Sequence, residues 1–256
     1  LIGGTISPDY QVPGIGPLIQ RKLTGCRQIP AIDLRSGCTV ILQSLQLARA
    51  LLLAGLARHV VCFGAEAQSR GLDLHRRSAE LSMLFGDGAG ALVISRDLPE
   101  NASGVIRLDD VLIETDGSFA EDLCVRGAAW ESDETTLLPF MNGRAVILHA
   151  VRKMCDAAGL VMRRNEITPE QIALVVPHQA NANLLRALGT QMGMPADRIV
   201  STVAQTGNTS GASAFIALAE AKRTGRLQAL APGDHVLLPA FGAGFSWGAA
   251  LGTITR

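Results

Sequence analysis

The sequence is poor in charged residues, in aromatic residues and in cysteine. Only 18% of its 256 residues are charged and 4% are aromatic, whereas 48% are hydrophobic. The 23 basic residues balance the 23 acidic ones, so no excess charge attracts nucleic acid or an anionic membrane surface. This composition predicts a globular protein that buries a substantial core. We expect its partners to be small molecules or specific protein surfaces, with no nucleic acid and no membrane among them.

The five cysteines are odd in number and never spaced as CxxC, which argues against a disulfide framework and against a zinc site. We therefore expect reduced thiols and a cytoplasmic location. The longest apolar run, residues 40–54, is short for a membrane span and carries Gln43, Gln46 and Arg49, so we expect a buried helix. The sequence begins at Leu1 without an initiator Met, and we expect that upstream sequence is missing.

Segments typical of strands and of helices alternate along the whole chain. We expect strands at residues 30–34, 59–64, 81–85, 89–95, 105–114, 173–176, 199–203, 235–239 and 246–254. We expect helices at residues 38–53, 143–158, 183–192 and 210–222. Residues 3–17 are rich in Gly and Pro and predict a loop. Such alternation indicates an α/β fold in which helices cover largely buried sheets.

Cys38 is a candidate nucleophile because it lies between a predicted strand and a long apolar helix. A thiol at a helix start faces unpaired N–H groups and the positive end of the helix dipole, which favour the thiolate. The alternative is a small buried cysteine that packs as an apolar residue. The local sequence leaves both interpretations open.

Two further polar residues occupy loops that follow strands or precede helices. His178 comes directly after a predicted strand, where α/β proteins commonly present functional groups, and His is the usual side chain for proton transfer. Asn208 lies in a Gly-Asn-Thr-Ser loop, where its amide is able to donate to a thioester carbonyl. The alternatives are a histidine satisfied by backbone groups and an ordinary turn with a helix cap.

Two glycine-rich segments complete the pattern. Glycines on both sides of Ala243 interrupt the apolar C-terminal segment, which suggests a close backbone approach and an oxyanion donor at the N–H of Ala243. Residues 86–90, Gly-Asp-Gly-Ala-Gly, precede a strand instead of a helix, so they do not fit a dinucleotide-binding fingerprint. We interpret residues 86–90 as structural.

Taken in order, the segments SGC, FGDGAGA, VVPHQAN, GNTSGAS and AFGAGFSWGAAL resemble the β-ketoacyl-acyl-carrier-protein synthase III family of condensing enzymes. The resemblance covers nearly the whole chain, with 140 residues from Cys38 to His178 and 30 from His178 to Asn208. It implies a duplicated thiolase-like fold with five αβαβα layers and a homodimer. The two halves would be residues 1–97, truncated at their start and carrying the cysteine, and residues 98–256, carrying His178 and Asn208. We expect that the family's upstream portion is missing from this sequence.

The resemblance also implies a mechanism. Cys38 attacks an acyl thioester, while the N–H groups of Cys38 and Ala243 hold the oxyanion. His178 and Asn208 then stabilise the enolate that forms when a malonyl thioester loses carbon dioxide. The carbanion attacks the acyl group and gives a 3-oxoacyl thioester, as in fatty acid biosynthesis. Acyl-CoA, or acyl carrier protein, and a malonyl thioester are the implied substrates, and no metal or cofactor is required.

The sequence departs from the family pattern at its substrate contacts. The family's Asp-Arg-Gly-Thr segment is replaced by Ser-Ala-Glu-Leu, so Arg76 and Arg77 are the candidates for contact with coenzyme A or a carrier. Arg186 is the corresponding candidate after the PHQAN segment. Val12 stands where acetyl-specific relatives often place a bulky Phe across the dimer, which predicts an acyl pocket for donors longer than acetyl. Arg35 has no counterpart in the pattern.

Two other functions remain open from the sequence alone. A diverged acyltransferase or thioesterase would keep Cys38 and His178 and transfer the acyl group to water, an amine or an alcohol. Asn208 disfavours this alternative, because enolate stabilisation is what the His and Asn pair serves. A non-catalytic subunit of a condensing heterodimer is the second alternative, and it would usually lose the nucleophile that this chain retains.

Overall fold

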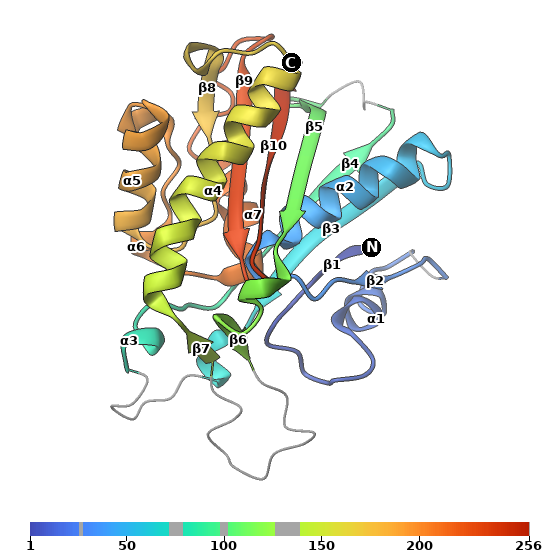
Figure 1. Cartoon of the computed structure of the whole chain (residues 1–256). Helices are drawn as coiled ribbons and strands as arrows, with labels where there is room; N and C mark the ends of the chain where they lie inside the picture. Colours follow the sequence, from blue (N-terminus) through green and yellow to red (C-terminus); the bar gives the residue numbers. More distant parts are fainter. Residues whose placement is uncertain (26–27, 72–78, 98–101, 126–138, 256) are drawn as a thin grey trace.

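The computed structural model describes residues 1–25, 28–71, 79–97, 102–125 and 139–255 (Figure 1). Two four-stranded sheets organise these residues. The first sheet has the order β2-β1-β3-β4 and consists of β1 (Ile2–Gly4), β2 (Ile32–Asp33), β3 (His59–Glu66) and β4 (Gly88–Ser95). The second has the order β5-β10-β9-β8 and consists of β5 (Ile106–Thr115), β8 (Ile172–Val175), β9 (His235–Gly242) and β10 (Ser246–Ile254). A short pair, β6 (Leu123–Val125) and β7 (Pro139–Met141), stands apart.

Both sheets are mixed. In the first sheet, β1 pairs in parallel with β2 and with β3, whereas β4 runs antiparallel to β3. In the second, β8 and β9 are parallel, and β10 is antiparallel to both β9 and β5. Parallel neighbours bring their carboxyl ends to the same edge, which is where loops of α/β proteins present functional groups.

Two helices form the layer that joins the sheets. Helix α2 (Val40–Leu53) contacts β1 and β3 of the first sheet and also β5 and β10 of the second. Helix α7 (Ser213–Arg223) packs on β3 and β4, and its buried residues share one core cluster with Val236 and Leu238 of β9. The apolar composition of residues 40–54 is therefore explained by burial on several sides of α2 within the protein.

The opposite face of the second sheet is covered by α4 (Gly143–Arg164), which contacts β9, β10 and also α5 (Ala182–Met192) (Figure 1). The side chain of Asn142 caps the start of α4 by accepting the N–H of Ala145 at 3.3 Å. Three shorter helices, α1 (Ile15–Gln20), α3 (Ala79–Ser82) and α6 (Val203–Thr206), lie in the connections. Within the described residues, no helix is long and apolar enough to cross a membrane.

Most predicted elements are confirmed, including the helix at residues 38–53, which ends at Leu53 and is followed by Gly55 with a φ of +70°. Two predicted strands are wrong. Residues 81–82 end α3, residues 83–84 form a turn, and Phe85 makes only an isolated bridge with Asn208. Ile199 likewise makes only an isolated bridge, with Val175, and α6 begins at Val203. Their apolar composition reflects packing against neighbouring elements, which strands and buried turns share.

The predicted loop at residues 3–17 begins with a strand that the sequence did not indicate. Strand β1 contains two glycines because neighbouring backbone lies very close: a Cβ on Gly3 would stand 2.0 Å from the carbonyl oxygen of Phe63. Glycine weakens strand patterns in a sequence, so the tertiary approach that requires it also conceals the strand. The division of the chain into two halves between residues 97 and 98 stays a prediction. Helix α2 in the first half and α7 in the second contribute residues to the same core cluster.

Candidate active site

Cys38 lies in a short 3-10 turn, Gly37–Thr39, that leads directly into α2, so its predicted position at a helix start is confirmed. The turn is closed by Thr39, whose hydroxyl donates to the carbonyl of Ser36 at 3.0 Å. The sulfur of Cys38 lies 3.5 Å from the hydroxyl oxygen of Ser210, which is remote in sequence. This contact brings the candidate nucleophile against the loop that follows Asn208.

The electrostatic environment of Cys38 differs from the sequence-based expectation. Burial raises the pKa of the Cys38 thiol to about 11, the hydrogen bond with Ser210 lowers it, and the negative charge of Glu66 raises it. Desolvation therefore outweighs the helix start, and the resting group at neutral pH is the thiol.

His178 follows β8 and is held from two sides. Its backbone N–H donates to the carbonyl of Pro239 on β9 at 2.9 Å, and its Nδ1 atom lies 2.7 Å from the hydroxyl oxygen of Ser213. The residue is only 3% exposed, and burial lowers the pKa of its imidazole to about 4. The ring is thus neutral at pH 7, with one nitrogen protonated and the Nε2 side left for a substrate.

Asn208 is fixed by backbone and side-chain contacts together. Its N–H donates to the carbonyl of Leu84 at 2.8 Å, and its carbonyl accepts the N–H of Gly86 at 3.1 Å. Its side-chain oxygen accepts the N–H of Ser210 at 2.8 Å. Because a backbone N–H only donates, the amide atom facing it is the oxygen, and the NH₂ group is left to donate to a substrate.

The end of β9 comes directly against the nucleophile. A Cβ on Gly242 would stand 2.9 Å from Cβ of Cys38 and 3.3 Å from its backbone nitrogen. Only glycine permits this approach without displacement. Ala243, the predicted oxyanion donor, is the next residue along the chain and therefore lies at the same edge.

The structure thus brings the sequence-predicted residues Cys38, His178 and Asn208 together around two segments, residues 208–213 and the end of β9. Sequence reasoning missed the roles of three other residues in this region: Glu66, Ser210 and Ser213. The two serines belong to a motif whose composition equally suits helix caps. Glu66 ends a strand, and nothing in its neighbouring sequence signals that its partners lie about sixty or more residues away.

The other residues predicted to contact substrate lie on the protein surface or outside the described residues. Val12 is 86% exposed on the loop before α1. Arg186 is exposed on α5, where it donates to the side chain of Asn183. Arg35 is exposed and donates to the side chain of Gln11 at 3.4 Å. Arg76 and Arg77 fall outside the described residues.

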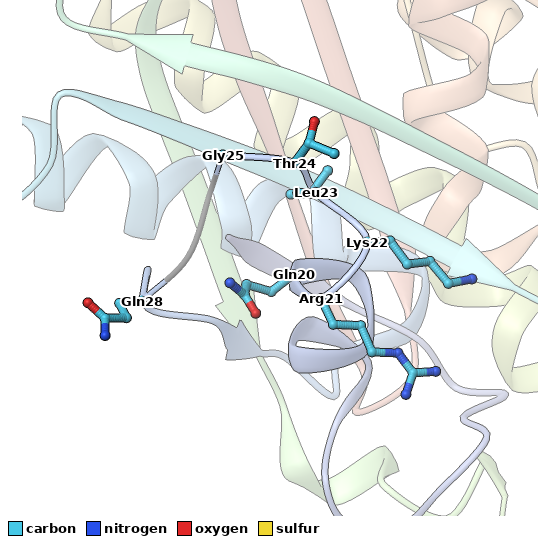
Figure 2. Close-up of a pocket in the computed structure, with 7 residues that line it drawn as sticks. All are labelled: Gln20, Arg21, Lys22, Leu23, Thr24, Gly25 and Gln28. Carbon is cyan, nitrogen blue, oxygen red and sulfur yellow. The ribbon is translucent and has the colours of Figure 1, made fainter.

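Two surface cavities lie away from these side chains. One, of about 670 Å³, is formed by the end of α1 and the turn after it (Figure 2); its lining residues are Gln20, Arg21, Lys22, Leu23, Thr24, Gly25 and Gln28. The other, of about 200 Å³, includes Tyr10, Asp33 and Arg35. Neither lining contains Cys38, His178 or Asn208. Within the described part of the chain, no group of three His, Cys, Asp or Glu residues is arranged to hold a metal ion.

Known proteins match this chain over nearly all of its length. The family model described as 3-oxoacyl-[acyl-carrier-protein (ACP)] synthase III matches residues 32–117, and the model of its C-terminal part matches residues 162–254. The β-ketoacyl-[acyl-carrier-protein] synthase III of Nitratidesulfovibrio vulgaris (strain DP4) is 37% identical over 253 residues, which cover 96% of this chain and 74% of that protein.

Solved structures of condensing enzymes also resemble this chain. The crystal structure of 3-oxoacyl-[acyl-carrier-protein] synthase III from Aquifex aeolicus VF5 matches with a TM-score of 0.85 and 30% identity, over 98% of this chain and 75% of that one. The priming β-ketosynthase of the R1128 polyketide biosynthetic pathway matches with a TM-score of 0.82 and 30% identity, over 99% and 73%. The chain therefore spans about three quarters of the length of these relatives.

Proposed function

The chain belongs to the 3-oxoacyl-[acyl-carrier-protein] synthase III family, and we propose that Cys38, His178 and Asn208 perform the reaction of that family here. Membership confirms the resemblance seen in the sequence, the thiolase-like α/β fold and the activity of a condensing acyltransferase of fatty acid biosynthesis. Such an enzyme joins an acyl thioester to a malonyl thioester with loss of carbon dioxide. The observation that supports these residue roles is that all three side chains contact residues of one segment, 208–213.

In the first half-reaction, the sulfur of Cys38 forms a bond to the acyl carbonyl carbon. The bond to the donor's sulfur breaks, and the departing thiol takes up the proton that Cys38 loses. Negative charge develops on the carbonyl oxygen, and the N–H groups of Cys38 and Ala243 donate to it. The close approach of Gly242 to the backbone of Cys38 supports this pairing of donors.

In the second half-reaction, a malonyl thioester loses carbon dioxide, and the electron pair left behind forms an enolate. The Nε2–H of His178 and the NH₂ of Asn208 donate to the enolate oxygen, which lowers the barrier to decarboxylation. The carbanion attacks the acyl carbon on Cys38, the C–S bond breaks, and the Cys38 sulfur regains a proton. Every step uses protein groups and the two thioesters, so the proposed mechanism includes no metal or cofactor.

We also propose a homodimer. Strand β4 ends the order of the first sheet, so one of its edges is unpaired within the described residues, and Val93 on it is 66% exposed. Edge strands with exposed apolar side chains are suited to pairing with another copy. The exposure of Val12 fits a residue that closes the partner's acyl pocket. Acyl-CoA or an acyl carrier protein is the proposed donor, with Arg186 on the exposed face of α5 as a contact.

The residue roles are tested by two assays on the full chain. Mass spectrometry after incubation with acyl-CoA donors should reveal an acyl adduct that is lost in Cys38→Ala. Release of carbon dioxide from malonyl-CoA should fall in His178→Ala and in Asn208→Ala, while Cys38 acylation persists in both. Hydrolysis of the acyl adduct without malonyl decarboxylation in the wild type would instead support a thioesterase.

A further inference from the structure

Glu66, at the end of β3, is a buried carboxylate with an unusual number of partners. It is only 6% exposed, and its carboxylate accepts hydrogen bonds from two hydroxyls and two backbone N–H groups. Its Oε2 atom accepts the hydroxyls of Thr5 and Ser7, at 3.0 and 2.8 Å, and the backbone N–H of Ile6 at 3.0 Å. Its Oε1 atom accepts the backbone N–H of Gly211 at 3.3 Å. Burial raises the pKa of the carboxyl, and these donors, which favour the ionised form, oppose part of that rise.

The two backbone donors explain why a carboxylate is required at this position. Ile6 and Gly211 approach different oxygens, and a backbone N–H has no capacity to accept. An amide in place of the carboxylate would present an NH₂ group to one of them, which leaves a buried donor facing another donor. Glu66 therefore joins two segments, residues 5–7 and residues 210–211, that no isosteric neutral side chain joins equally well.

The segment anchored by Gly211 carries the contacts that set the geometry of the site. Ser210 places its hydroxyl oxygen 3.5 Å from the Cys38 sulfur and its N–H 2.8 Å from the side-chain oxygen of Asn208. The backbone of Ser210 has a φ of +43°, which a side-chain-bearing residue adopts only when its surroundings hold it. A Cβ on Gly211 would stand 3.1 Å from the carbonyl oxygen of Gly37. The turn is thus pressed against the nucleophile's own turn.

We propose that Glu66 is a positioning residue that holds the Ser210–Gly211 turn against Cys38 and thereby aligns the amide of Asn208. This role rests on the function proposed above, because alignment matters only if Cys38 and Asn208 act on substrate. Loss of the anchor lets the turn move away from Cys38, and displacements of about 1 Å commonly cost enzymes large factors in rate. Both half-reactions are expected to slow, since Ser210 contacts Cys38 as well as Asn208.

The test compares Glu66→Gln, which keeps the length but removes the charge, with Glu66→Asp, which keeps the charge but is one methylene shorter. Glu114→Gln is the matched control, because Glu114 is an exposed carboxylate on β5 that accepts the indole N–H of Trp247. We expect Cys38 acylation and malonyl-CoA decarboxylation to fall roughly tenfold or more in both Glu66 variants and to stay within about twofold in the control.

A second measurement, the rate of Cys38 alkylation, distinguishes the effect of the Glu66 charge from a general loss of structure around the site. The charge of Glu66 raises the pKa of the Cys38 thiol, so alkylation of Cys38 at pH 8 should be faster in Glu66→Gln than in Glu66→Asp. Equal alkylation in the two variants, or acylation within about twofold of wild type in either, would overturn the assignment.

A measurement on the wild-type protein applies even if neither variant folds. The Gly211 amide should exchange its hydrogen slowly by NMR, and exchange at the rate of an exposed loop would refute the anchor. If the wild type is never acylated at Cys38, the proposed function fails. The anchor itself is still judged by the exchange of Gly211.

Discussion

The hydroxyl oxygen of Ser213 lies 2.7 Å from Nδ1 of His178 and also accepts the backbone N–H of Gln179 at 3.3 Å. A hydroxyl has one proton to give, and with one N–H already donated to its oxygen, its natural role is to donate to Nδ1. That arrangement leaves the proton of the neutral ring on Nε2. We therefore propose that Ser213 favours the His178 tautomer that is able to donate to an enolate.

Replacing Ser213 with alanine should impair decarboxylation while leaving acylation of Cys38 intact. The lost hydrogen bond is worth about 1 kcal/mol, which corresponds to a fall in rate of roughly fivefold to tenfold. Carbon dioxide release from malonyl-CoA reports the rate, and the ¹⁵N chemical shifts of His178 report the tautomer. Ser118→Ala, which removes an exposed hydroxyl, is the control. Unchanged rates together with unchanged ¹⁵N shifts would contradict the assignment.

The burial of His178 predicts a specific acid sensitivity. Its pKa is lowered from 6.5 to about 4, so between these values the unfolded chain binds a proton that the folded protein does not. The stability contributed is present above pH 6.5 and is lost as the pH falls towards 4, by up to about 3 kcal/mol. Urea denaturation from pH 4 to 8 should show a shallower acid dependence in His178→Gln than in wild type. His59→Gln, at an exposed histidine, should match the wild type.

Alkylation of Cys38 should be slow at neutral pH and should climb steadily with alkalinity, because burial raises the pKa of its thiol to about 11. Iodoacetamide labelling followed by peptide mass mapping gives the rate for Cys38 separately from the other cysteines. Between pH 7 and 10 we expect a rise of about tenfold for each pH unit. Ser210→Ala should slow labelling further, since the hydrogen bond of Ser210 lowers that pKa. A plateau below pH 9 would show that the thiol is not desolvated.

Gly242→Ala should abolish acylation, because the added Cβ would stand 2.9 Å from Cβ of Cys38. Overpacking of this kind costs about 1 to 3 kcal/mol of folding stability and displaces the groups involved. Thermal denaturation and acyl-adduct mass spectrometry measure the two effects. Gly143→Ala is the matched control, because a Cβ there meets nothing within 4 Å. Normal acylation in Gly242→Ala would show that β9 moves aside freely.

Val12→Phe should shift donor preference towards short acyl chains if Val12 closes the acyl pocket across a dimer. Adduct formation with octanoyl-CoA should fall, while adduct formation with acetyl-CoA is maintained or improved. Leu53→Phe, a similar enlargement at an exposed position on α2, should leave the preference unchanged. Equal use of both donors by wild type and Val12→Phe would place the end of the pocket elsewhere.

Most elements and the principal residues of the candidate site could be predicted from local signals. A strand followed by an apolar helix indicated the position of Cys38, and loops at element ends indicated His178 and Asn208. Apolar periodicity and glycine located most helices and strands, because these depend on neighbours within a few residues. The family motifs supplied the reaction class.

What only the tertiary structure decided are the contacts between residues far apart in the sequence. The bonds from Glu66 to Gly211 and from Ser213 to His178 span 145 and 35 residues, and no local pattern encodes them. The same holds for the thiol of Cys38: the helix start favours its ionisation, but burial by distant segments reverses the balance. Desolvation of the Cys38 thiol depends on every residue that packs around it. Those neighbours are brought together only when the two sheets pack against α2 and α7.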